Sequence, residues 1–256
     1  MAALKHLKLE KDNGIARIIF NRPKHNVLNI EMMETLNSEL EALIDDHELK
    51  GVLFLGEGPS WCAGVEVSDH KPEMVDEMIT VFSRIFELIE KIPVPTIAAV
   101  HGACLGGGME VAIACDMIFA AESAIFGQPE IRLGFFPPYA AIRLPHLIGP
   151  AKTIEICTTG NRYSAKEAMQ MGFVSRVVPD EAFTKGMDKL TGTLQSCSPL
   201  ILSLNKKAVK QHLHMDFPEA MKGVNDLFLN TLMRTEDTLE GIKSFEEKRR
   251  PQWKNR

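Results

Sequence analysis

The sequence feature that most constrains the fold is a glycine cluster between apolar segments, Gly102-Ala-Cys-Leu-Gly106-Gly107-Gly108. Residues 95–100 before it are rich in β-forming side chains, and residues 109–115 after it have the length of a short apolar helix. A further β-forming segment follows at 117–121. This order of strand, turn, helix and strand is typical of a parallel sheet covered by helices. The cluster therefore predicts an α/β fold.

The remaining sequence extends this pattern in both directions. Asn13-Gly14 between two β-forming segments predicts a hairpin, and Asn29 is suited to cap a helix that begins at Ile30. Beyond residue 164 the pattern is mainly helical. We therefore expect an α/β core over residues 1–195 and a helical C-terminal region over 196–256. The other predicted strands are 7–10, 15–20, 51–55 and 175–178, and the predicted helices are 30–46, 73–91, 180–195, 199–214, 218–232 and 235–248.

Composition excludes several classes of protein. The 256 residues are 45% hydrophobic and 25% charged, as in a soluble globular protein, and the net charge is −5 with scattered basic residues. That distribution argues against a nucleic-acid partner. No segment approaches the ~20 apolar residues of a membrane span, and residues 1–8 lack the apolar segment of a secretion signal. The five cysteines include no Cys-x-x-Cys pair, which disfavours zinc and disulfides. We expect a cytoplasmic protein.

Two glutamates and two glycine-containing turns are the candidates for chemistry. The glycine cluster is neither a P-loop nor a dinucleotide fingerprint, but its free N–H groups at a helix start could bind an oxyanion. A tight connection without a ligand is the alternative. Glu110 follows the cluster on a helix that we expect to be buried, and Glu130 follows Pro129 in a loop or helix start. Taken alone, Glu110 is better explained as an acid that favours a helix start, and Glu130 as a surface acid near Arg132. The turn Trp61-Cys-Ala-Gly-Val-Glu66 could supply another N–H group.

Together these segments resemble the crotonase (enoyl-CoA hydratase/isomerase) superfamily almost from end to end. The resemblance implies a spiral of ββα units with a helical C-terminal region that mediates trimerisation, in a homotrimer or homohexamer. It also implies a coenzyme A thioester substrate and neither metal nor redox cofactor. The matching motifs are Phe20-Asn-Arg-Pro-Lys24, Ala63-Gly64-Val65, Gly106-Gly107-Gly108-Met109-Glu110, Phe126-Gly-Gln-Pro-Glu130 and Glu240-Gly-Ile-Lys-Ser-Phe245-Glu-Glu-Lys248-Arg.

The resemblance assigns roles to the two glutamates and to the two glycine-containing turns. Glu110 would activate water and Glu130 would deliver a proton, although the roles could be inverted or shared. Keeping both acids favours a hydratase, which adds water across the conjugated double bond of the thioester. The backbone N–H groups of Val65 and Gly107 would bind the thioester oxygen. Mutual repulsion of the two carboxylates should raise one pKa.

Further residues are implied in binding the acyl-CoA molecule. Ala63 belongs to the first oxyanion turn, and Lys24 and Val27 would lie along the coenzyme A. Phe245 and Lys248 would lie near its nucleotide end and could come from a neighbouring subunit.

Two departures from the usual hydratase pattern concern the substrate. Phe135-Phe136-Pro137-Pro138-Tyr139 replaces a glycine-rich stretch, and the turn after Val65 is unusual. Together with the C-terminal sequence Trp253-Lys-Asn-Arg, these departures resemble a subgroup of the family. That subgroup converts cyclohexa-1,5-diene-1-carbonyl-CoA to 6-hydroxycyclohex-1-ene-1-carbonyl-CoA in anaerobic benzoyl-CoA degradation. Tyr139 and His70 are candidate substrate contacts, with a packed aromatic ring and a surface histidine as the alternatives. A straight-chain enoyl-CoA hydratase of β-oxidation and a non-catalytic acyl-CoA- or RNA-binding relative are the competing functions.

Overall fold

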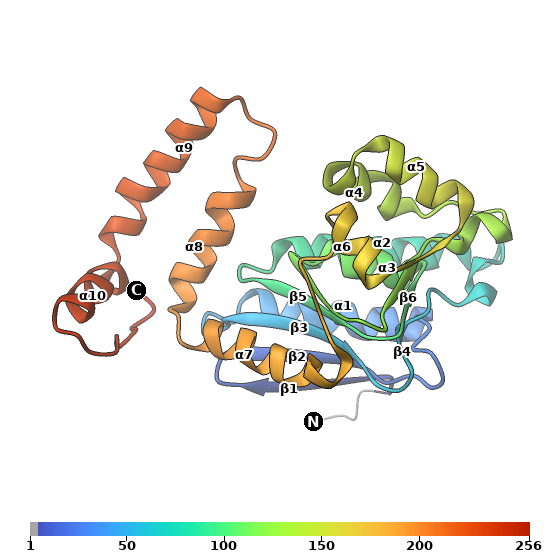
Figure 1. Ribbon diagram of the computed structural model, residues 1–256, viewed down its shortest axis with the longest axis horizontal. Helices are drawn as coiled ribbons and strands as arrows, with labels where there is room; N and C mark the ends of the chain where they lie inside the picture. Colours follow the sequence, from blue (N-terminus) through green and yellow to red (C-terminus); the bar gives the residue numbers. More distant parts are fainter. Residues whose placement is uncertain (1–4) are drawn as a thin grey trace.

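The computed structural model describes residues 5–256, so the first four residues of the N-terminal segment considered above lie outside it. Two sheets form the core (Figure 1). The large sheet has the strand order β1-β2-β3-β5-β7-β10, and the small sheet has the order β4-β6-β8-β9. The strands are β1 Leu7–Asp12, β2 Ile15–Phe20, β3 Gly51–Gly56, β4 Ser60–Cys62, β5 Thr96–Val100, β6 Ala103–Leu105, β7 Met117–Ala121, β8 Ile125–Gly127, β9 Arg162–Ser164 and β10 Arg176–Val178.

Ten α-helices and four 3₁₀ helices connect and cover these sheets in the described part of the chain. The α-helices are α1 Ile30–Ile44, α2 Val75–Lys91, α3 Gly107–Ala114, α4 Pro138–Ile148, α5 Pro150–Thr159, α6 Ala165–Met171, α7 Phe183–Gln195, α8 Pro199–Lys210, α9 Phe217–Asn230 and α10 Glu236–Glu246. The 3₁₀ helices are η1 Val67–His70, η2 Pro129–Leu133, η3 Asp180–Ala182 and η4 Leu232–Arg234.

Local sequence signals explain the first elements. Asn13 and Gly14 have φ angles of 45° and 79°, so this pair forms the tight turn between β1 and β2 that the Asn-Gly motif predicts. The Asn29 side chain accepts a hydrogen bond from Met32 N at 3.3 Å, which confirms it as the N-cap of α1. The hairpin and the helix are therefore specified locally.

The chain winds through the two sheets as a spiral. β3, β5 and β7 are parallel neighbours in the large sheet, while β4, β6 and β8 are parallel neighbours in the small one. Each turn thus adds one strand to each sheet before a helix follows. This arrangement confirms the predicted ββα spiral. The sequence pattern does not predict the small sheet, because the glycine cluster indicates only a turn, whereas it contains β6.

Helices cover both faces of the large sheet. One buried cluster joins α1, α2 and α3 to the sheet, and Phe54, Trp61 and Phe126 are among its largest members. On the other face, Met187 and Leu194 of α7 pack against Ile97 and Phe119. The apolar side chains of the sheet are thereby buried on both sides, as expected for parallel strands.

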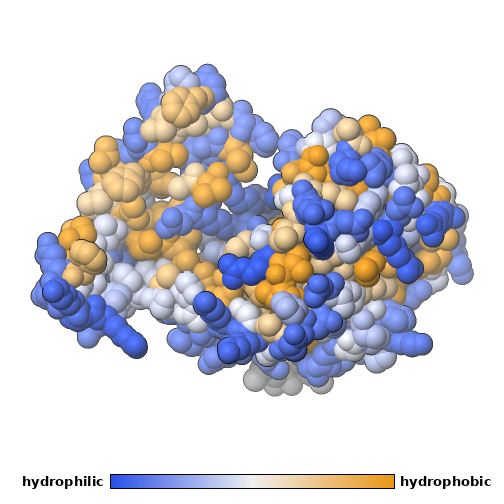
Figure 2. All heavy atoms as spheres, in the orientation of Figure 1, coloured by the Kyte–Doolittle hydropathy of each residue, from blue (hydrophilic) through white to orange (hydrophobic). Residues whose placement is uncertain are grey.

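Helices α8, α9 and α10 extend away from the core (Figure 1). Lys206 on α8 ties this region to the sheets, because its Nζ lies 2.7 Å from Asp116 Oδ2 and 3.0 Å from the Val94 carbonyl oxygen. Many large apolar side chains remain exposed on the region (Figure 2). The domain division at residue 195 and the role in trimerisation stay predictions. The exposed apolar residues are Val209, Leu213, Met215, Phe217, Met221, Phe228, Leu229, Met233, Leu239, Ile242 and Phe245.

The structure can be searched for membrane-spanning helices and for metal-binding clusters. Within residues 5–256, no helix has both the length and the apolar character needed to cross a membrane. In the same residues, no three or more His, Cys, Asp or Glu side chains gather in a way that could hold a metal ion. The expected absence of a cofactor stays a prediction.

Candidate active site

The topology of the small sheet brings the separate motifs together. The first turn, Gly64-Val65, follows β4, the second begins at Gly106 directly after β6, and Gln128 follows β8. Because these three strands are parallel neighbours, their carboxyl ends lie side by side at one end of the sheet. Segments distant in the sequence therefore meet at the carboxyl ends of the strands, where α/β proteins commonly bind ligands.

Glu110 lies on α3, a helix whose eight residues are all buried. Its side chain is only 2% exposed, and Oε1 accepts hydrogen bonds from the backbone N–H groups of Tyr139 and Ala140, at 2.7 and 2.8 Å. These donors belong to the first turn of α4, which has no side-chain cap of its own. Glu110 therefore caps α4 from another helix, and this fixes the orientation of its carboxyl group.

Glu130 lies in η2, immediately after Pro129, as predicted. The buried Gln128 amide lies against it, and in the orientation that satisfies both groups its nitrogen donates to both carboxylate oxygens at 3.1 Å. On the other side, a Cβ atom on Gly106 would lie 2.6 Å from Glu130 Oε1, and the φ of this residue is +54°. Only glycine leaves room for the carboxylate and adopts this backbone conformation readily.

Both carboxyl groups have raised pKa values. Burial raises the pKa of Glu110 from 4.5 to about 8, against the lowering effect of its two backbone hydrogen bonds, and the charge of Glu130 adds to the rise. Burial also raises the pKa of Glu130, to about 7. Repulsion between the two was the expected cause, but loss of hydration is the main one. The pair therefore changes protonation around neutral pH.

Two backbone N–H groups, of Val65 and Gly107, lie at the same end of the small sheet. Gly107 is the first residue of α3, so its N–H lacks an intrahelical acceptor, and Val65 follows a glycine with a φ of +122°. Neither N–H has a backbone acceptor among residues 5–256. The two residues are in close contact, since a Cβ on Gly107 would lie 2.5 Å from Val65 Cγ2. The arrangement supplies two unpaired donors at a helix N-terminus.

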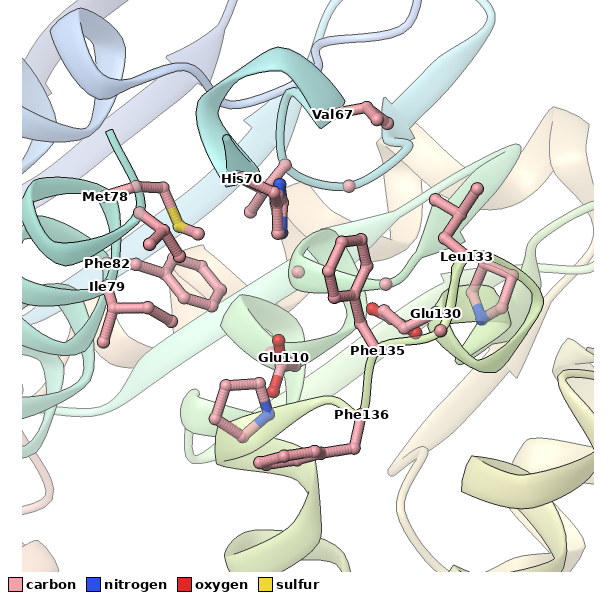
Figure 3. Close-up of a pocket in the computed structure, with 18 of the residues that line it drawn as sticks. Val67, His70, Met78, Ile79, Phe82, Glu110, Glu130, Leu133, Phe135 and Phe136 are labelled. Carbon is pink, nitrogen blue, oxygen red and sulfur yellow. The ribbon is translucent and has the colours of Figure 1, made fainter. Parts of the chain in front are cut away.

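A cavity of about 450 Å³ opens in front of these groups, and both carboxyl groups are directed into it (Figure 3). Its walls are mainly apolar and come from α2, η1, η2 and the segment before α4. The lining residues are Ala63, Gly64, Val65, Val67, His70, Val75, Met78, Ile79, Phe82, Gly106, Gly107, Glu110, Pro129, Glu130, Arg132, Leu133, Gly134, Phe135, Phe136 and Pro138. Such a cavity suits an apolar substrate that carries one polarised oxygen.

The match to known proteins covers almost the whole chain. Residues 10–256 match the family described as enoyl-CoA hydratase/isomerase. The chain is a member of this family. The crystal structure of enoyl-CoA hydratase subunit I from Geobacillus kaustophilus HTA426 superposes with a TM-score of 0.90 and 32% identity, over all of both chains.

Several family relatives carry names that state a reaction. A crotonyl-CoA hydratase of Syntrophomonas wolfei is 34% identical, over 97% of each chain. A cyclohexa-1,5-dienecarbonyl-CoA hydratase of Thauera aromatica is 32% identical, over 97% of this chain and 96% of its own. The protein is therefore a hydro-lyase that acts on enoyl-CoA thioesters.

The structure of this hydratase brings together most of the predicted chemical residues. Ala63, Val65, Gly107, Glu110 and Glu130 all line one cavity. Their individual roles stay predictions.

Other predicted binding residues lie elsewhere. The Tyr139 ring stacks on Phe86, with ring centroids 3.9 Å apart, and is not part of the cavity lining. This packing corresponds to the alternative given for Tyr139 above, a packed aromatic ring instead of a substrate contact. Lys24 and Val27 are also outside the lining, and the helix α10 that carries Phe245 lies at the far end of the same chain (Figure 1). A part for Phe245 and Lys248 in this cavity would thus require a neighbouring subunit.

Sequence reasoning missed one wall and one supporting residue. Met78, Ile79 and Phe82 of α2 line the cavity, but their helical spacing looks the same as that of core residues. Gln128 was noticed only as part of a motif, and its burial against Glu130 carried no separate signal. His70, a candidate substrate contact with a surface histidine as the alternative, lies in the cavity wall.

Proposed function

We propose that Glu110 and Glu130 together add water to the conjugated double bond of an acyl-CoA thioester. The observation that carries this proposal is the meeting of two carboxyl groups, both with raised pKa values, and two unpaired N–H groups in one apolar cavity. Glu110 would activate the water, and Glu130 would deliver the proton to carbon. The charge of Glu130 adds to the rise in the pKa of Glu110, so the two titrations would be coupled, and the acid and base roles could be inverted or shared between the two glutamates.

The two N–H groups would stabilise the reaction intermediate. Attack of water at the β-carbon moves electrons onto the thioester oxygen, and this oxyanion would bind between the N–H groups of Val65 and Gly107. Each such donor is typically worth about 3 kcal/mol in the transition state. The reaction needs no electron transfer, so we propose that coenzyme A enters only as part of the substrate and that no other cofactor takes part.

For the acyl group, we propose a cyclic dienoyl thioester, cyclohexa-1,5-diene-1-carbonyl-CoA, of anaerobic benzoyl-CoA degradation. Phe135, Phe136 and Pro138 line the cavity where related hydratases have a glycine-rich stretch, and this gives a broad apolar wall. The name of the Thauera aromatica relative supports this choice. Crotonyl-CoA is the second candidate, because the Syntrophomonas wolfei relative named for it is 34% identical, against 32% for the Thauera aromatica relative.

A direct comparison of both substrates tests the proposal. We expect the purified protein to convert the cyclic dienoyl-CoA to 6-hydroxycyclohex-1-ene-1-carbonyl-CoA with a kcat/KM at least tenfold above that for crotonyl-CoA. Product identity would be checked by mass spectrometry and NMR. Rapid hydration of crotonyl-CoA with no conversion of the ring substrate would instead assign the straight-chain function.

We also propose that the chain assembles as a homotrimer or a dimer of trimers through α8, α9 and α10. The exposed apolar side chains there, with Phe245 86% exposed, support this. Sedimentation equilibrium that yields a monomer at micromolar concentration would contradict it. A cytoplasmic location stays a prediction, and a relative from Dictyostelium discoideum is named as mitochondrial.

A further inference from the structure

His70 is a polar group in the cavity wall that the mechanism above does not use. It ends the short helix η1, and its Nδ1 lies 3.0 Å from the carbonyl oxygen of Glu66. A carbonyl oxygen can only accept a hydrogen bond, so Nδ1 must carry a hydrogen. The Glu66 carbonyl thereby fixes which ring nitrogen is free to exchange a proton, and that nitrogen is Nε2.

The imidazole ring of His70 lies in the cavity wall. Figure 3 shows the ring directed into the cavity towards Glu110, with Phe82 and Phe135 to either side in this view. The ring packs against Phe135, with centroids 4.8 Å apart. Across residues 5–256, the hydrogen bonds of this side chain include none at Nε2. An imidazole nitrogen without a partner in an apolar wall is available to the substrate.

The ring substrate creates a need for such a group, and this step rests on the proposed function. Water attacks the β-carbon of the ring, because only this position is activated by the thioester carbonyl. The electron pair then spreads over the thioester oxygen, the α-carbon and the far end of the second double bond. The stated product keeps a double bond conjugated to the carbonyl. The proton must therefore reach the ring carbon opposite the one that gains the hydroxyl group.

Few groups in the cavity could deliver that proton. The titratable side chains in its lining are Glu110, Glu130, His70 and Arg132. An arginine does not give up its proton in proteins. For this ring substrate both carboxyl groups would hold the water, and His70, which lies across the cavity from Glu110 in Figure 3, would replace Glu130 as the proton donor to carbon. We propose that His70 is a catalytic acid that protonates the ring carbon opposite the site of water attack.

The proposed step balances. The water oxygen forms a bond to the β-carbon while Glu110 takes one of its protons. The electron pair of the second double bond forms a bond to the proton on Nε2 of the His70 imidazolium. Neutral imidazole remains, with Nδ1 still hydrogen-bonded to Glu66. Exchange with solvent then returns a proton to Nε2 and removes one from Glu110, so the net change is the addition of one water.

Substitutions at His70 test the step through substrate selectivity. His70→Asn can keep a hydrogen bond to the Glu66 carbonyl but has no Nε2, and His70→Gln places an amide that cannot act as an acid. We expect both to lower the ratio of kcat/KM for the ring substrate to that for crotonyl-CoA by about 10²–10⁴-fold, the usual range for losing an acid. Reactions in D₂O would show by NMR which carbon gains deuterium.

The outcomes separate this inference from the proposed function. If the wild type converts the ring substrate and both variants keep its selectivity ratio, His70 is not the acid. If the wild type places deuterium next to the thioester carbonyl, protonation at the opposite carbon is also ruled out. A wild type that hydrates crotonyl-CoA but not the ring substrate would overturn the proposed substrate itself. Unchanged circular dichroism spectra would show that both variants fold.

Discussion

Gly107 and Val65 are packed so closely that a methyl group on the Gly107 α-carbon would lie 2.5 Å from Val65 Cγ2. It would also lie 3.0 Å from Phe82 Cζ. Backbone N–H groups from two different turns of the spiral are thus held near each other by the absence of one side chain. Their separation depends on this contact.

Gly107→Ala should therefore reduce catalysis more than stability. The new methyl group would push Val65 away and separate the two N–H donors, which should lower kcat by about 10²–10³-fold. Stopped-flow or absorbance assays with crotonyl-CoA would measure this. Gly192→Ala on α7 is the matched control, because nothing lies within 4 Å of its added methyl group. A Gly107→Ala variant with wild-type kcat would argue against an oxyanion site here.

Glu110→Gln and Glu130→Gln should each lower kcat by about 10²–10⁴-fold, since an amide can neither accept nor deliver the proton. Glutamine at 110 can still accept the two hydrogen bonds from the first turn of α4, so the fold should be retained. The exposed Glu122→Gln provides a control for loss of one surface charge. Hydration that survives both active-site changes would show that neither carboxylate takes part.

Stability should fall as pH rises through the range in which Glu110 ionises. Its pKa is about 8 in the folded protein against 4.5 ordinarily, so between these values the folded state binds more protons than the unfolded state. The stabilising contribution is complete below pH 4.5 and is lost as pH rises to about 8. Glu110→Gln removes this dependence. We expect the difference in Tm, variant minus wild type, to increase from pH 5 to pH 9 in calorimetry; a constant difference would contradict the raised pKa.

Lys206→Met should destabilise the attachment of α8. Removing one partner of a fully buried ion pair usually costs about 3–5 kcal/mol. The Lys206 and Asp116 side chains are 9% and 19% exposed, and Lys210 lies 3.5 Å from Asp116, so the loss should be near or below the lower end of that range. Urea unfolding would measure it. Lys152→Met, which breaks the exposed pair with Glu155, should leave the free energy of unfolding almost unchanged. Similar losses from both variants would mean that the Lys206 pair is effectively solvated.

Local signals predicted the hairpin at Asn13-Gly14, the cap at Asn29 and the buried helix that carries Glu110. The small sheet escaped prediction, because strands such as Ser60–Cys62 are three residues long, too short for alternation to show. The wall formed by α2 could not be found either, because an apolar helix face looks the same whether it covers a core or a cavity. The contact between Glu110 and the N-terminus of α4 joins residues 30 apart, and no local pattern encodes it.

The resemblance to a family supplied what periodicity could not. It related the two glycine turns and the two acids to one site, and the structure places Val65, Gly107, Glu110 and Glu130 around one cavity. It could not give the cause of the pKa shifts, which depends on burial. Nor did it show that the Tyr139 ring stacks on Phe86 and lies outside the cavity lining.

The placement of the three motifs at the ends of β4, β6 and β8 has a consequence for how such enzymes diversify. The ends of these strands carry the two glycine turns and the segment that leads to Glu130, whereas the opposite cavity wall comes from α2 and from residues 133–138, in segments that connect the strands. Mutations in those connections can change the size and polarity of the acyl site without shifting the strand ends. New substrate preferences can therefore arise while the hydration chemistry is inherited unchanged.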